Sequence, residues 1–344
     1  MCTNLRQKQY YIFNEPHTKE EYETKMKQLQ LGSYVTLQYL VKKFEDFRAA
    51  NAIYRSNKID QCEGSTGHRL FNCKDAENCF ELEEARDALR CLEGVQIKDC
   101  ADCVSFGGVK TVAELGYEVQ ESCDFYNFKF CNFCYSKDNL EYCDECSNCS
   151  NCFGCIGLKN ESFRIFNKKY PEADYHALKA KIVKHMKKNG EYGWFFPPDY
   201  SPFAYNETEV MEYFSLEKEE ALRQGFRWED ELPTVEGVAL DSISIQDSVT
   251  DAKDEITKQV FACEISGKKF VITSQELAFH KRMGVALPRR SPGQRHKDHL
   301  KERLVCHLYD RPCTKCGTPL QSAYPLIDRY RKVYCDECYF KAVY

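Results

Sequence analysis

The stretch Cys143-Asp-Glu-Cys146-Ser-Asn-Cys149-Ser-Asn-Cys152-Phe-Gly-Cys155 places a cysteine at every third position. Free cysteine is among the most buried residue types, and the interleaved asparagines suit tight turns and side-chain ladders. The stretch therefore favours stacked coils of chain whose thiols are buried and structural. Two alternatives stay open: some of these cysteines form a second zinc site, or they carry iron-sulfur or redox chemistry.

An iron-sulfur cluster of the bacterial ferredoxin kind follows the pattern C-x2-C-x2-C-x3-C and then proline. Here only two residues separate Cys152 from Cys155, and Ile156 stands in the place of the proline. The stretch departs from the ferredoxin pattern at its most specific position, so buried structural thiols are the favoured interpretation.

Shorter versions of the stretch recur along the chain, each with Asn or Asp, a cysteine and an apolar residue in close succession. They are Asn78-Cys79-Phe80, Asp102-Cys103-Val104, Asn132-Phe-Cys134-Tyr135 and Asn151-Cys152-Phe153. A small unit that recurs every roughly eighteen to thirty residues is typical of a solenoid, whose stacked turns share one core. We therefore predict a short parallel β-solenoid over about residues 60 to 165, in a chain of the α+β class.

A longer repeat joins the two ends of this region. The segment Leu5-Arg-Gln-Lys-Gln-Tyr-Tyr-Ile-Phe-Asn14 recurs as Leu158-Lys-Asn-Glu-Ser-Phe-Arg-Ile-Phe-Asn167. Each copy predicts a strand that ends at the asparagine and is followed by a helix. Thr18 and Glu21 form a capping box for the first helix, and Pro171 marks the start of the second.

Two amphipathic helices are expected beside the solenoid, where apolar residues recur with the helical period. Their apolar stripes are Tyr34, Leu37, Leu40, Val41, Phe44 and Phe47 after Ser33, and Tyr175, Leu178 and Ile182 before Gly190. Between residues 191 and 238, closely spaced prolines and aromatics predict an ordered connector that packs on the solenoid. We expect Asn206 and Gly225 to cap short helices within it.

Four cysteines near the C-terminus form the sharpest chemical motif. Cys313-Thr-Lys-Cys316 and Cys335-Asp-Glu-Cys338 are two C-x2-C pairs, and the eighteen residues between them leave room for two strands. This spacing is typical of a tetrahedral Zn²⁺ site. Because four sulfurs close the coordination shell, we predict one structural zinc ion rather than a catalytic one.

A second knuckle-like segment begins at Cys263, but serine stands at the second ligand position, Ser266. Farther on, Ser291 and Gln294 have the spacing of a second pair, and one thiolate with such neutral oxygens is a poor zinc site. We predict a degenerate, metal-free module whose helix starts with a capping box at Thr273 and Glu276 and ends at Gly284. The histidines His280, His296 and His299 match no closed site.

The composition bounds the class of protein. The chain has 344 residues and 21 cysteines, an odd number. The N-terminus shows no apolar signal region, and no run of about eighteen apolar residues exists. We therefore expect a cytoplasmic protein without a membrane span, in a reducing compartment where cysteines are thiols or metal ligands.

The charge is unevenly distributed. The net charge is −5, yet residues 281–303 carry eight Lys or Arg against two acids. This segment suits an anionic partner, and a solvated face beside the zinc site is the alternative. The candidate contacts are Arg289, Arg290, Arg295, Lys297, Lys301 and Arg303.

These observations predict five regions. They are an N-terminal cap (1–60), the cysteine-rich solenoid (61–190), the connector (191–255), the degenerate module (256–305) and a zinc ribbon (306–344).

The chain also resembles a family of cysteine-rich zinc-ribbon proteins from uncultivated small-genome bacteria, some of them labelled CaiB/BaiF. The resemblance rests on Asn151–Leu158, Ser201–Thr208, the Ser266-Gly-Lys-Lys-Phe segment and the terminal ribbon around Val333–Cys338. Residues 263–295 resemble a probable zinc-binding domain, with Ser266, Ser291 and Gln294 in place of cysteines. The resemblance implies zinc binding and carries over no activity.

The function that these patterns favour is a non-enzymatic scaffold that docks on nucleic acid or on a protein through its basic C-terminal part. The alternative is a redox or metal-handling protein that uses Cys143 to Cys155. No H-E-x-x-H, G-x-S-x-G, P-loop or G-x-G-x-x-G motif favours an enzyme, and no catalytic residue is predicted.

Overall fold

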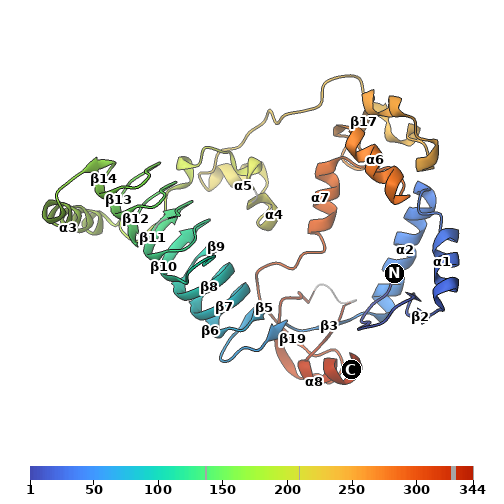
Figure 1. Cartoon of the computed structure of the whole chain (residues 1–344), viewed down its shortest axis with the longest axis horizontal. Helices are drawn as coiled ribbons and strands as arrows, with labels where there is room; N and C mark the ends of the chain where they lie inside the picture. Colours follow the sequence, from blue (N-terminus) through green and yellow to red (C-terminus); the bar gives the residue numbers. More distant parts are fainter. Residues whose placement is uncertain (136–137, 209, 327–330, 344) are drawn as a thin grey trace.

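The computed structural model describes residues 1–135, 138–208, 210–326 and 331–343. Figure 1 shows the solenoid strands stacked in a row, with α3 (Glu172–Asn189) across the far end of the row. The helices α1 (Lys19–Gln28) and α2 (Tyr34–Asn51) lie on the opposite side of the molecule, beside the C-terminal modules. The predicted α+β architecture with a parallel β-solenoid is confirmed.

The solenoid is one long sheet in which neighbouring turns pair in parallel. Equivalent residues of adjacent turns are twelve positions apart, as in the side-chain ladder from Asn127 to Asn139. The predicted unit of eighteen to thirty residues was therefore too long. The strands are β4 (Ile59–Asp60), β5 (Gly67–Phe71), β6 (Lys74–Glu77), β7 (Cys79–Leu89), β8 (Leu92–Ala101), β9 (Val104–Gly107), β10 (Ala113–Gln120), β11 (Tyr126–Asn132), β12 (Asp138–Glu141), β13 (Ser150–Phe153), β14 (Ser162–Ile165) and β15 (Lys168–Lys169).

Each turn consists of three-residue steps. One residue of the step points into the core, the next points outward, and the third turns the corner in the left-handed conformation, as Asn148 and Asn151 do with φ near 51°. Asparagine and aspartate tolerate this conformation better than other non-glycine residues. The cysteine at every third position is therefore the inward residue of every step.

The inward cysteines bond to the backbone at the corners. The Cys143 thiol donates to the carbonyl of Glu141 at 3.5 Å and to the carbonyl of Cys152, on the next turn, at 3.6 Å. The Cys155 thiol does the same with Phe153 and Arg164, at 3.4 Å each. The carbonyls of Glu141 and Phe153 also accept the amides of Gly154 and Phe166 from the next turn. A thiol is thus small enough for the narrow core and adds a second, weaker donor to carbonyls that the ladder already pairs.

The two copies of the long repeat form the same structure. Each is a hairpin with a Phe-Asn corner, rather than the single strand that the sequence predicted. The first joins β1 (Tyr11–Ile12) to β2 (Glu15–Pro16), and the second joins β14 to β15. Asn14 bonds both backbone groups of Thr3, and Asn167 bonds both of Ile156, so even the corner contacts recur.

Both predicted amphipathic helices form, but only α3 lies beside the solenoid as predicted (Figure 1). The helix α2 instead contacts the C-terminal part of the chain, where the Tyr34 hydroxyl donates to the Glu264 carboxylate at 2.7 Å. Ser33 caps α2, and the Thr18–Glu21 capping box starts α1. The connector packs on the solenoid as predicted, because the Gly193 amide donates to the Tyr142 hydroxyl at 3.0 Å. The expected cap at Asn206 was wrong, since its side chain bonds the backbone of Glu229 instead.

The remaining elements belong to the connector and to two C-terminal modules. The Cys263 module (residues 240–305) and the Cys313 ribbon (residues 306–344) each contain an antiparallel hairpin and then a helix. The elements are α4 (Val210–Tyr213), α5 (Lys218–Arg223), β16 (Leu240–Asp241), β17 (Val260–Ala262), β18 (Lys269–Val271), α6 (Ser274–Met283), α7 (Pro292–Leu300), β19 (Tyr309–Pro312), β20 (Pro319–Ser322), β21 (Lys332–Tyr334) and α8 (Asp336–Val343). Short 3₁₀ helices lie at Pro198–Tyr200, Tyr205–Glu207, Ser242–Ser244, Val249–Asp251 and Asp254–Lys258.

Candidate metal centre

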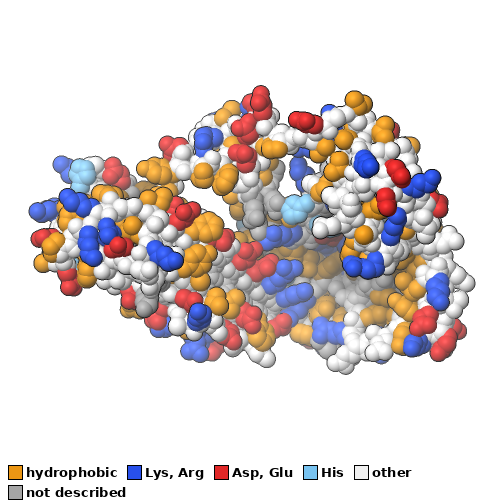
Figure 2. Space-filling view, turned by 45° about the horizontal axis from the view of Figure 1, so that its top comes forward, with side chains coloured by type: hydrophobic (Ala, Val, Ile, Leu, Met, Phe, Trp, Pro, Cys, Tyr) orange, Lys and Arg blue, Asp and Glu red, His pale blue; other side chains and the backbone are white. Residues whose placement is uncertain are grey.

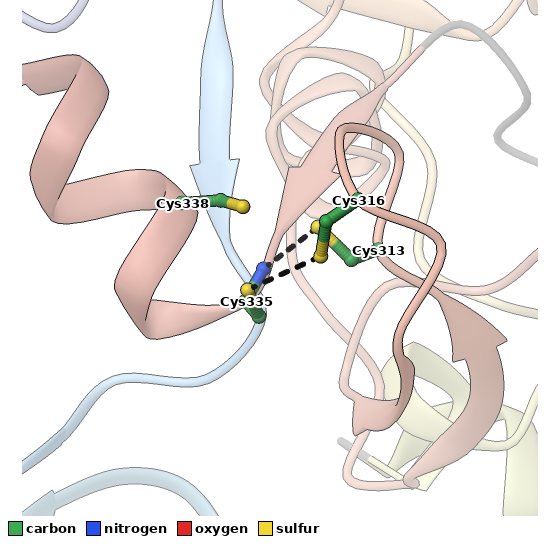
Figure 3. Close-up of side chains that lie close together, drawn as sticks. All are labelled: Cys313, Cys316, Cys335 and Cys338. Carbon is green, nitrogen blue, oxygen red and sulfur yellow. Dashed lines mark hydrogen bonds between the residues drawn. The ribbon is translucent and has the colours of Figure 1, made fainter.

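The four C-terminal cysteines meet at one point. The sulfurs of Cys313, Cys316, Cys335 and Cys338 all lie within 4.8 Å of one another, and in the described part of the chain they are the one group of His, Cys, Asp or Glu that could hold a metal ion. Figure 3 shows two of them on the loop after β19 and two at the start of α8. The predicted four-cysteine site is thus confirmed as a geometric arrangement.

A tight knuckle positions the first pair. The amide of Gly317 donates to the carbonyl of Cys313 at 2.9 Å, and the amide of Cys313 donates to the carbonyl of Thr318 at 2.9 Å. Gly317 has φ of 78°, which a residue with a Cβ adopts only with strain. The glycine after the second cysteine therefore lets the chain fold back into β20 while both sulfurs face the same side.

The distances fit a tetrahedral metal site. The Cys316 and Cys335 sulfurs are 3.8 Å apart, and the Cys335 amide donates to the Cys313 sulfur at 3.3 Å. Four ligands at about 2.3 Å from a central ion have edges of about 3.8 Å. The donor set and its spacing thus match a thiolate-bound ion, and the close sulfurs need a cation to balance their charge when ionised.

The thiols differ in how readily they ionise. Hydrogen bonds from the hydroxyl and amide of Thr318 lower the pKa of Cys316 to about 6. Burial, followed by the neighbouring thiols, raises the pKa of Cys338 to about 12. A bound metal ion would hold both sulfurs as thiolates, including that of Cys338, because metal ligation deprotonates a thiol outright.

The ribbon is anchored to the N-terminal region. The strand β21 pairs in parallel with β3 (Ile53–Arg55), and the Arg55 guanidinium forms two hydrogen bonds of 2.9 Å with the Asp336 carboxylate. The Ser322 hydroxyl donates to the carbonyl of Ser56 at 2.8 Å. Sequence reasoning missed this anchor because no local pattern links residues so far apart in the chain.

The Cys263 knuckle has the same backbone bonds as the Cys313 knuckle. The Cys263 amide donates to Lys268 at 3.0 Å, and the Gly267 amide donates to Cys263 at 2.9 Å. Burial opposes ionisation of Cys263, but hydrogen bonds from the Ser266 hydroxyl and from nearby amides, including that of Ser291, lower the pKa of its thiol to about 7. Serines thus surround the sulfur where a metal site would have further thiolates.

The other residues of the predicted degenerate module have structural roles. The Ser291 hydroxyl caps α7 by accepting from the Gln294 amide, and the Gln294 side chain donates to Asp298 at 3.0 Å. Thr273 caps α6, but the Glu276 carboxylate pairs with Arg295 at 2.7 Å rather than completing a capping box. The histidines named above join no metal-binding group in the described ranges.

The stretch from Cys143 to Cys155 occupies slightly more than one turn of the solenoid. Cys146, Cys149, Cys152 and Cys155 are the inward residues of its four steps, and Cys143 lies one turn below Cys155. All five are at most 1% exposed. Their sulfurs are not gathered into a metal-binding group in the described residues, and metal or redox chemistry at this stretch stays a prediction.

The basic segment is largely paired within the chain. The Arg290 guanidinium contacts Glu264 at 2.8 Å and Asp298 at 2.9 Å, and Lys301 contacts Asp298 at 3.0 Å. Arg303 pairs with Glu93 of the solenoid at 3.0 Å. On the face of the molecule drawn in Figure 2, Lys or Arg and Asp or Glu side chains lie next to one another in the middle of the view.

The last two basic candidates differ from each other. Arg289 stacks on the Tyr34 ring, with 4.2 Å from its guanidinium carbon to the ring centre, and donates to the carbonyl of Ile245 at 3.2 Å. Lys297 is exposed and forms no ion pair within the residues that the structure places. Most basic side chains of this segment therefore form contacts within the chain, and Lys297 is the one candidate whose side chain has no ion pair, hydrogen bond or ring contact among the described residues.

No family model matches the chain, and no curated protein matches it. In the described residues, no helix has the length and apolar character that a membrane span requires.

Proposed function

We propose that the protein is a non-enzymatic scaffold that binds another protein through its C-terminal part, with one structural Zn²⁺ at the four cysteines. Zinc is the ion that four thiolates in two C-x2-C pairs select most often. The same arrangement supports the proposal that the chain belongs with the cysteine-rich zinc-ribbon proteins that it resembles.

The observation that carries the choice of partner is the pairing of the basic segment. A surface that binds phosphates by charge keeps its Lys and Arg side chains available to release counterions. Here Arg290, Arg295 and Arg303 contact carboxylates of the same chain instead. A protein partner is therefore favoured over RNA or DNA.

The helix α6 offers a surface of the kind that proteins recognise. Phe279 and Met283 are one helical turn apart and are 50% and 57% exposed. The Arg282 guanidinium lies over the Phe279 ring, 5.7 Å from its centre. Exposed aromatic and Met side chains beside arginine are enriched where proteins bind one another. We infer that the partner presents an apolar patch edged by acidic side chains.

The test uses the full, zinc-loaded chain with a photo-crosslinking amino acid at position 279. The control places the same group at Val109, which is 74% exposed on the solenoid. We expect a protein adduct from position 279 that survives nuclease treatment, is absent from position 109 and is lost in Met283→Asp. An adduct that nuclease removes, or equal adducts from both positions, would contradict the proposal.

A further inference from the structure

A cavity of about 220 Å³ lies where the start of α3 meets the wall of the solenoid, away from the metal centre. Asn127 and Lys129 line it from β11, Asn139 and Glu141 from β12, and His176 and Lys179 from α3. None of these side chains takes part in the metal centre or in the proposed docking surface. The cavity is therefore a separate feature that calls for its own explanation.

Glu141 is the informative residue of the cavity. It is 6% exposed, and one oxygen of its carboxylate contacts the Lys179 ammonium at 2.6 Å. The other oxygen, Oε1, is buried and has no hydrogen-bond partner in the described part of the chain. Burial, and then a side-chain hydrogen bond with Glu141, raise the pKa of Tyr192, so the Tyr192 hydroxyl lies beside the carboxylate. Oε1 itself still has no hydrogen-bond partner among the described residues.

A buried carboxylate oxygen without a donor costs free energy that the rest of the fold has to offset. The cost disappears when a bound molecule donates a hydroxyl hydrogen to that oxygen. An ammonium group is a less suitable donor, because Lys179 already neutralises the carboxylate. The unpartnered oxygen therefore favours a ligand with hydroxyl groups.

The remaining charge of the cavity favours an anion. Lys129 makes no ion pair in the residues that the structure describes, and Glu141, its cross-strand neighbour on β12, is already paired with Lys179. The two lysines and the one carboxylate leave the cavity with a net positive charge. The stacked amides add polar groups along one wall, where Asn127 donates to Asn139 at 2.7 Å. A carboxylate on the ligand would pair with Lys129 while its hydroxyls bond Glu141 and the amides.

We propose that this cavity binds a small polyhydroxylated carboxylate of the sugar-acid class. Glu141 accepts a hydroxyl hydrogen, Lys129 pairs with the carboxylate, and the asparagines fix the orientation of the remaining hydroxyls.

The experiment measures binding of gluconate to the full chain by calorimetry and by saturation-transfer NMR. Glucose has the hydroxyls without the charge, and propionate has the charge without the hydroxyls. We expect gluconate to bind and the other two to bind about tenfold more weakly or worse, since each lacks one charged hydrogen bond. Equal binding of glucose, or no binding of gluconate because the cavity holds only water, would overturn the proposal.

Two variants locate the binding. We expect Lys129→Met and Glu141→Gln each to weaken gluconate binding by about tenfold or more, and Lys159→Met, an exposed solenoid lysine outside the cavity, to leave it unchanged. If Glu141→Gln does not fold, Lys129→Met decides the question because Lys129 lies outside the core. Unchanged affinity in Lys129→Met would assign the binding to another place on the molecule.

Discussion

The Cys313 ribbon and the Cys263 module have the same knuckle backbone, but only one of them has the ligands for a metal. Both knuckles turn at a glycine of positive φ, 78° at Gly317 and 66° at Gly267. Both are held by the next segment, where the Thr314 amide donates to Val333 and the Glu264 amide donates to Arg289. The backbone bonds of a metal knuckle thus form in a module that has only one of the four thiols.

The difference lies in what surrounds the knuckle. The Cys263 module buries a contiguous apolar cluster, which contains Ile245, Val249, Ala252, Ile256, Phe261, Cys263, Phe270, Ile272, Leu277 and Leu287. In the described part of the ribbon, the buried apolar residues are Cys313, Ala323, Tyr324 and Val333. An apolar core of ordinary size therefore does in one module what a metal ion would do in the other.

The largest contrast is expected when one cysteine of each module is changed to serine. Cys335→Ser should unfold the ribbon, because in such small sites the metal-binding free energy, about 10 kcal/mol or more, is the folding free energy. Cys263→Ser should cost about 1 to 2 kcal/mol, as for other small buried changes. Limited proteolysis and metal content measure both, and a protease-resistant ribbon in Cys335→Ser would refute the contrast.

Restoring the missing ligands should convert the second module into the first. We expect the triple variant Ser266→Cys, Ser291→Cys and Gln294→Cys to raise zinc content from about one to about two ions per chain. The wild-type backbone already places Cys263 beside Ser266 and Ser291. Mass spectrometry of the native protein checks this, with Ser266→Ala, Ser291→Ala and Gln294→Ala as the matched control. Unchanged zinc content in the cysteine variant would show that the two knuckles differ more than their backbones indicate.

Removing one core side chain should lower the free energy of unfolding more in the Cys263 module than in the Cys313 ribbon, the reverse of the cysteine substitutions. Phe270 is 2% exposed in β18, and Phe270→Ala should cost about 3 to 5 kcal/mol. The corresponding residue of the ribbon, Leu320, is half-buried, and Leu320→Ala should cost about 1 kcal/mol while zinc stays bound. Urea unfolding of the zinc-loaded chain compares the two, and equal losses would contradict the division between apolar core and metal.

Acid should weaken the contact of the ribbon with the solenoid through His68. Burial, and then Arg69, Lys58 and Arg55, lower the pKa of His68 to about 4, while its ring packs on Tyr324. Below about pH 6.5 the imidazole of the unfolded chain takes up a proton that the buried His68 of the folded protein does not. The free energy of unfolding is therefore unaffected by His68 titration above about pH 6.5. It falls by about 1.4 kcal/mol per pH unit down to about pH 4.

The comparison of the wild type with His68→Gln isolates this effect, since protonation of the metal-binding thiols is common to both. The variant should lose stability less steeply between about pH 6.5 and about pH 4 in urea titrations. His176→Gln, which changes an exposed histidine, should follow the wild type. Parallel curves for His68→Gln and the wild type would exclude His68 as the source of the acid sensitivity.

The sequence allowed the parallel solenoid and the metal centre to be predicted, because both depend on short-range spacing. The three-residue spacing from Cys143 to Cys155 equals the length of one solenoid step, in which one residue of three points into the core. The full turn of twelve residues was missed because the inward positions accept residues as different as Ala76, Leu82 and Phe128. The irregular segment around Gly108 also interrupts the repeat, so the turns share little sequence.

The rest depended on contacts between distant residues. Nothing near Arg55 indicates that it binds Asp336, and nothing near Glu141 indicates that α3 covers it. The basic segment was read as a candidate surface because the acids that pair with it, such as Glu93 and Glu264, lie elsewhere in the sequence. Local sequence patterns predict the type of each element and the metal ligands. Contacts between residues that are distant in the sequence can be identified only from the three-dimensional structure.

The pairing of β21 with β3 has a consequence for the order in which the molecule forms during translation. Arg55 leaves the ribosome 281 residues before its partner Asp336. The solenoid can grow turn by turn as it emerges, since each turn needs only its neighbours. The strand β3, which precedes the solenoid in the chain and pairs with β21, keeps an open edge until the ribbon has been made. Nascent chains therefore pass through a long interval in which that edge can pair with another chain.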